Sequence, residues 1–95
     1  MRFFVVATRS PDQPAEAFQP HLAAESRRAT EMYRDGLIRE IYSRADGKGA
    51  VLVFEAASEA EVAAGMKSLP MVENGLLGFE IHGVGPYRGF LASLG

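Results

Sequence analysis

The stretch Pro20–Gly36, PHLAAESRRATEMYRDG, decides the fold, because it is the longest segment of this sequence with unbroken helical character. A helix turns by about 100° per residue, and on that wheel four nonpolar side chains share one arc. These residues are Leu22, Ala29, Met32 and Tyr33. The pattern predicts an amphipathic helix that buries this arc and that Gly36 closes as a left-handed cap.

Glu25 falls inside this nonpolar arc, three residues after Leu22 and four before Ala29. A carboxylate that faces a core is costly unless it is paired, hydrogen-bonded or next to a cavity. Burial also disfavours its charged form and raises its pKa, which suits a general acid or base. We therefore predict that Glu25 is catalytic. The alternative is that Glu25 only pairs with His21, Arg28 or a strand arginine at the core edge.

Three other side chains of this helix are candidates for the same site. His21 and Arg28 flank the arc at one edge, one turn to either side of Glu25. Histidine titrates near physiological pH, so we predict His21 as the proton-relay partner, with an exposed first-turn residue as the alternative. Arg28 and Tyr33 are predicted to bind substrate, although an aromatic residue at such a position is usually a packing residue.

The rest of the chain predicts four strands and a second helix. The strands are expected at Arg2–Thr8, Leu37–Ala45, Gly49–Ala56 and Leu76–Val84. Asp46-Gly47-Lys48 between the middle two is typical of a hairpin turn. Ser58 and Glu61 have the spacing of a capping box, which opens a helix that Pro70 is expected to end.

The order strand, helix, strand, strand, helix, strand predicts an α+β, ferredoxin-like βαββαβ fold. Such a fold has a four-stranded antiparallel sheet with two helices on one face. We expect a single domain over residues 1–95. Phe3–Val6 and Val51–Phe54 are nonpolar on both faces, so the uncovered face also needs burial. A second copy of the chain would cover it, which predicts a homodimer. The nonpolar arm at 85–95 is expected to pack on its own sheet or on the partner subunit.

The second strand contributes two more candidates. Side chains alternate along a strand, so one face carries Glu40, Tyr42 and Arg44, and the other carries Leu37, Arg39, Ile41 and Ser43. The sequence leaves open which face meets the helices. If the second set does, Arg39 can hold a substrate carboxylate, or it can form a buried salt bridge with Glu25. Tyr42 is predicted to contact substrate, with core packing as the alternative.

Composition excludes several classes of function. The net charge is −2, with no basic footprint for nucleic acid. Cysteine is absent and there are two histidines, which leaves no thiolate chemistry and little for a metal site. No dinucleotide or phosphate-loop motif occurs, so no cofactor is expected. The nonpolar run Met1–Ala7 is too short for a membrane span and lacks the features of a signal peptide, which predicts a cytoplasmic protein. The expected partner is a small organic molecule, bound in a cleft beside Glu25.

Between Ala24 and Pro86, several groups of residues follow one family pattern. They are Glu25, Arg34-Asp35-Gly36, Arg39, Tyr42, Ala45, Val53-Phe54, Ser58, Leu69-Pro70 and Glu80. With these residues the chain resembles the muconolactone isomerase-like branch of the dimeric α+β barrel superfamily. The resemblance implies cofactor-independent proton transfer on a small acidic lactone or enol. Because Glu25 lies in the nonpolar arc, our hypothesis makes Glu25 the base, with His21 as the relay and Arg39 orienting the substrate.

The sequence departs from the isomerase pattern at two positions. In the isomerase a lysine follows the helix acid and a histidine sits in the turn after the second strand, where this chain has Ser26 and Gly47. Two alternatives therefore stay open. One is a cofactor-independent monooxygenase of the same superfamily. The other is a non-catalytic ligand-binding dimer, because Pro20-His21-Leu22 is similar to the YCII-related proteins.

Overall fold

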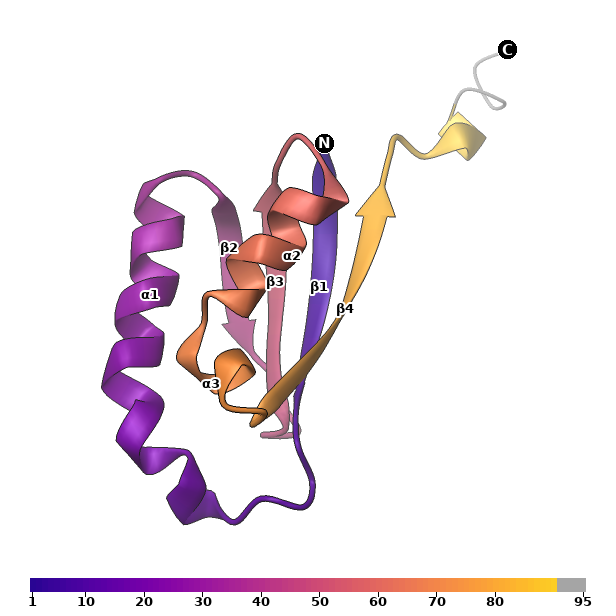
Figure 1. Cartoon of the computed structure of the whole chain (residues 1–95). Helices are drawn as coiled ribbons and strands as arrows, with labels where there is room; N and C mark the ends of the chain where they lie inside the picture. Colours follow the sequence, from indigo (N-terminus) through magenta and orange to yellow (C-terminus); the bar gives the residue numbers. More distant parts are fainter. Residues whose placement is uncertain (91–95) are drawn as a thin grey trace.

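The computed structural model describes residues 1–90, which form one antiparallel sheet covered by helices (Figure 1). The strands are β1 (Arg2–Arg9), β2 (Ile38–Ser43), β3 (Gly49–Glu55) and β4 (Leu77–Val84). The helices are α1 (Leu22–Arg34), α2 (Glu59–Lys67) and α3 (Pro70–Glu73), preceded by two short 3₁₀ helices, η1 (Ala15–Ala17) and η2 (Gln19–His21). No helix in this described range is long and nonpolar enough to cross a membrane.

The strand order is β2-β3-β1-β4 with antiparallel pairing throughout, which confirms the predicted α+β, ferredoxin-like topology. The helices lie on one face of the sheet (Figure 1). Pro70 was expected to end the second helix and to be followed by a loop. Instead it opens α3, because proline suits a first helical position, where no backbone N–H is needed.

Helix α1 begins at Leu22, two residues later than expected, because Pro20 belongs to the 3₁₀ helix η2. Gly36 has φ of +85°, which confirms the left-handed cap. Two members of the predicted buried arc are exposed, Leu22 at 42% and Tyr33 at 58%. The start of α1 stands over a cavity rather than over packed core, and Tyr33 lies on the outer side of the helix beside the buried Met32.

The core lies between the helices and the inner face of the sheet. Alternate β1 residues point into it, and they meet side chains from β3 and α2. The buried members are Phe3, Val5, Ala7, Met32, Ile38, Leu52, Phe54, Ala56, Val62, Met66 and Leu69. Gly65 lets α2 sit close to this layer, because a side-chain carbon there would lie 3.2 Å from a methyl group of Leu37. Ser58 accepts a hydrogen bond from the Glu61 backbone N–H, which confirms the predicted start of α2.

A β-bulge in β2 decides which of its side chains face the helices. The pairing register shifts between Ile38 and Glu40, so Arg39 is the extra residue and points to solvent. Ile41 pairs with Leu52 of the core, whereas Tyr42 pairs with Val51 on the opposite face. Simple alternation put Arg39 and Ile41 on one face and left open which face meets the helices. The bulge separates the two residues, so Ile41 faces the helices and Arg39 does not.

Within residues 1–90, no helix lies against the outer face of the sheet (Figure 1). Phe4 of β1 and Val84 of β4 are each 40% exposed there. Residues 85–90 run away from the sheet beyond β4 (Figure 1), and Tyr87 and Phe90 meet edge to face with ring centroids 4.8 Å apart. This part of the predicted arm does not pack on its own sheet, and residues 91–95 lie outside the described range.

Candidate functional site

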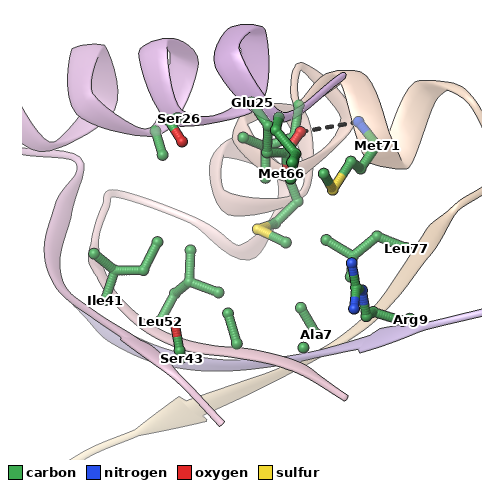
Figure 2. A pocket seen from close by; sticks show the side chains of 15 residues that line it. Ala7, Arg9, Glu25, Ser26, Ile41, Ser43, Leu52, Met66, Met71 and Leu77 are labelled. Carbon is green, nitrogen blue, oxygen red and sulfur yellow. Dashed lines mark hydrogen bonds between the residues drawn. The ribbon is translucent and has the colours of Figure 1, made fainter. Parts of the chain in front are cut away.

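A cavity of about 290 Å³ separates α1 from the inner face of the sheet (Figure 2). Most of its wall is nonpolar, and four polar side chains interrupt it. The nonpolar part comes from Ala7, Leu22, Ala29, Ile41, Gly49, Ala50, Leu52, Met66, Leu69, Met71 and Leu77. The polar side chains are Arg9, Glu25, Ser26 and Ser43. A concave, largely nonpolar site with a few convergent polar groups is typical of small-molecule binding.

Glu25 reaches this cavity from the first turn of α1. Its Oε1 accepts a hydrogen bond of 2.9 Å from the backbone N–H of Met71, at the start of α3 (Figure 2). Burial raises the pKa of Glu25 above its ordinary value of 4.5, while the Met71 bond and the charge of His21 oppose this rise. Glu25 is therefore a carboxylate that holds its proton more tightly than an exposed glutamate, as a proton-transfer group at neutral pH requires.

His21 is close enough to Glu25 for its charge to act on the carboxylate. It is half-buried at the position that precedes α1. The cavity wall does not include His21. His21 is therefore not placed to contact a molecule in the cavity directly.

Arg28 is engaged elsewhere. Its Nε donates to the Ser68 hydroxyl at 2.9 Å, and its guanidinium pairs with Glu31 at 3.2 Å. The bond to Ser68 joins α1 to the end of α2, whereas the pair with Glu31 lies within α1. Arg28 lies outside the cavity wall. The structure thus gives Arg28 an interhelical role, and the alternative pairing of Arg28 with Glu25 does not occur.

The other three predicted substrate-binding residues also lie away from the cavity. Arg39 is exposed at the bulge. The hydrogen bond from the N-terminal amine mainly lowers the pKa of Glu55, and the charge of Arg39 adds a smaller contribution in the same direction. Tyr42 stands on the outer face of the sheet, and its hydroxyl donates to Glu40 at 2.6 Å. Tyr33 is exposed and borders a second hollow between α1 and β2, which shares Ala29 and Ile41 with the first cavity. The predicted salt bridge between Arg39 and Glu25 is therefore absent, because the bulge turns Arg39 to solvent.

The cation in the cavity wall is Arg9, a residue that the sequence analysis missed. Phe3, Val5 and Ala7 point inward, and Arg9 continues this alternation at the end of β1. Its guanidinium carbon lies 4.0 Å from the centroid of the Phe18 ring. The period-two pattern was visible in the sequence, but the strand was expected to end at Thr8, so Arg9 was assigned to the following loop.

Together the fold and the cavity define a class, the small ferredoxin-like α+β proteins that enclose a small-molecule site between helix and sheet. The chain belongs to the muconolactone delta-isomerase family, whose family model matches residues 1–84. A search of curated proteins finds no match.

Two solved structures illustrate the shared fold. A 5-chloro-2-hydroxyhydroquinone dehydrochlorinase from Burkholderia phenoliruptrix AC1100, in complex with 2,5-dihydroxybenzoquinone, is similar with a TM-score of 0.75 and 17% identity, over 94% of this chain and 98% of that one. A muconolactone isomerase is similar with a TM-score of 0.72 and 24% identity, over 92% of this chain and 91% of that one. At these identities the likeness supports the fold alone.

The raised pKa of Glu25 predicts a pH dependence of stability. The native state binds this proton more tightly than the unfolded chain, so the associated stabilisation is complete below about pH 4.5 and is lost as the pH rises through the raised pKa. Glu25→Gln has no titrating group at this position. As the pH rises through this interval the wild type loses stability, so the free energy of unfolding of the variant should increase relative to that of the wild type. Urea unfolding from about pH 4 to about pH 8 measures the difference. Glu16→Gln, at an exposed position, is the control. A difference between Glu25→Gln and wild type that stays constant with pH would contradict the assignment.

Proposed function

We propose that this chain is a small-molecule enzyme that catalyses cofactor-independent proton transfer on a small acidic lactone or enol, with Glu25 as the base. The observation that carries the proposal is a half-buried carboxylate with a raised pKa on the wall of a mostly nonpolar cavity. Membership of the muconolactone delta-isomerase family supports it. The names of the two structural neighbours, a dehydrochlorinase and an isomerase, also state reactions on small organic molecules.

In this reaction Glu25 takes a proton from the ring carbon that bears the ring oxygen of an α,β-unsaturated lactone. The electrons of that C–H bond form a dienolate, and the C=C bond shifts when Glu25 returns the proton to the carbon next to the carbonyl. No atom is gained or lost. The Ser26 and Ser43 hydroxyls line the same cavity and can donate hydrogen bonds to the substrate oxygens. His21, whose charge acts on Glu25, would exchange the Glu25 proton with solvent.

The test is proton exchange in D₂O, followed by NMR on muconolactone and unsubstituted butenolides. The wild-type chain is expected to accelerate deuterium incorporation at the carbon next to the carbonyl. The heat-denatured chain is the control for buffer catalysis. Absence of protein-dependent exchange on every lactone would refute the proposal. Oxygen uptake with quinol substrates in place of exchange would favour the monooxygenase alternative.

One observation favours a non-catalytic ligand-binding protein as the second candidate. The hydrogen bond from Met71 gives Glu25 a structural role, because it satisfies a backbone donor at the start of α3, where Leu69 offers no side-chain cap. A chain that binds lactones but exchanges no proton would support this candidate. The raised pKa favours the enzyme, since a purely capping carboxylate is usually stabilised in its charged form.

We further propose that the chain forms a homodimer through the outer face of the sheet. Phe4 and Val84 are exposed on this face and no helix covers it. Sedimentation is expected to give the mass of two chains at micromolar concentration. Phe4→Lys would place a charge in the interface and weaken the dimer by about 100-fold or more. Ala64→Lys, on the exposed side of α2, should leave the mass unchanged. A wild-type monomer would contradict the dimer.

A further inference from the structure

Arg9 is fixed at the end of β1 by contacts on both its backbone and its side chain. Its backbone N–H donates to Lys48 at 2.8 Å, and in the sheet it stands opposite Leu77 of β4. The guanidinium stacks on Phe18, which is 3% exposed and packs with Met71 and Leu76 in a second nonpolar cluster. A cation–π contact on a buried ring orients the guanidinium plane, so the charge has a defined position.

The positive charge of Arg9 has no anionic partner within residues 1–90. Arg44, by comparison, pairs with Asp46 at 2.6 Å, and Arg28 pairs with Glu31. Glu25 receives its hydrogen bond from Met71 and not from Arg9. A guanidinium carries five N–H donors and loses solvation when it is half-buried, so an unpaired one on a cavity wall is suited to an incoming anion.

Arg9 also lines two cavities at once. On one side is the nonpolar cavity with Glu25, and on the other is an open hollow that Arg9 shares with Ser10, Gln13 and Lys48. Figure 2 shows Glu25 descending from the helix layer and Arg9 rising from the sheet on the opposite side of the cavity. A molecule between them meets nonpolar surface near Glu25 and positive charge near Arg9.

From this arrangement we infer that Arg9 binds the carboxylate of a small cyclic acid whose ring lies in the cavity beside Glu25. A cavity of about 150 Å³ holds benzene in another protein, so a space of about 290 Å³ accepts one ring with a substituent. A carboxylate matches the two-pronged edge of a single guanidinium. The ring chemistry at Glu25 rests on the proposed function, whereas the binding of the carboxylate by Arg9 does not.

Calorimetric titration with benzoate and its neutral analogue benzamide tests the inference. The wild-type chain is expected to bind benzoate about 10- to 100-fold more tightly than benzamide, as a charge-assisted pair implies. Arg9→Gln should remove this preference, and Arg9→Lys should keep part of it. Arg44→Gln is the matched control, because it removes a cation that already has a partner, and it should retain the full preference. Phenyl phosphate bound more tightly than benzoate would overturn the assignment to a carboxylate.

A second measurement keeps the inference falsifiable if Arg9→Gln does not fold. Benzoate is expected to shift the Arg9 Nε–H resonance of the wild-type chain in a ¹⁵N-edited NMR spectrum, and benzamide is expected to shift it far less. An unmoved resonance, or equal affinity of the wild type for the two probes, would overturn the inference. Glu25→Gln should still prefer benzoate. If lactone exchange is absent but benzoate is still preferred over benzamide, the result contradicts the proposed function alone. If the preference for benzoate is absent, the result contradicts the role of Arg9.

Discussion

Replacing Glu25 with glutamine is expected to lower the rate of lactone proton exchange by about 10²- to 10⁴-fold, the usual contribution of a positioned general base. The change is nearly isosteric. The glutamine amide oxygen can still accept the hydrogen bond from Met71, so the start of α3 should keep its partner. What is lost is the ability to take up a proton. The measurement is the deuterium exchange rate of the variant against that of the wild type at matched protein concentration.

Glu31→Gln is the control for this experiment. Glu31 lies on the same helix, is solvent-facing and pairs with Arg28 outside the cavity. Its removal should leave the exchange rate within about two-fold of the wild type, because surface substitutions away from a site have small effects. Exchange by Glu25→Gln at the wild-type rate would remove Glu25 from the chemistry. Equal losses in both variants would indicate general damage to α1 rather than a missing base.

The fold was predictable because its signals are local. The Asp46-Gly47-Lys48 turn, the Ser58 cap and the Gly36 cap each depend on a few neighbouring residues, and each occurs where expected. The element order then leaves few ways to bury four strands and two helices. Glu25 was found for the same reason, since its place on the helix wheel depends only on residues within two turns.

The remainder of the site depends on contacts that span the chain. The bulge that turns Arg39 outward arises where β2 meets β3, so no pattern within β2 reveals it. Arg9 reaches the cavity because β1 continues one residue beyond its expected end at Thr8, and because Phe18 packs against its guanidinium. The hydrogen bond between Met71 and Glu25 joins residues 46 positions apart. Helix periodicity placed Glu25 on the inner arc of α1, but only tertiary packing brings Arg9 to the same cavity wall.

Gly49→Ala is expected to destabilise the chain by about 3 to 5 kcal/mol, a large share of the total stability of a small domain. Gly49 has φ of +149°, and a side-chain carbon there would overlap the Ala7 carbonyl oxygen of the neighbouring strand. It would also lie 3.2 Å from the Thr8 Cα. Backbone atoms cannot rotate away as a side chain can, so β3 would have to separate from β1 at the wall of the cavity.

Gly47→Ala separates this clash from the cost of the backbone angle. Gly47 also has positive φ, +73°, but nothing lies within 4 Å of the position that its side chain would occupy. The cost of holding an alanine at positive φ alone predicts that Gly47→Ala lowers the free energy of unfolding by about 1 to 2 kcal/mol. Urea unfolding of both variants should therefore give a clearly larger loss at Gly49. Equal losses would mean that φ alone accounts for both. A larger loss of stability for Gly49→Ala than for Gly47→Ala would show that close contact between β1 and β3 holds the sheet together at the end where Arg9 lines the cavity.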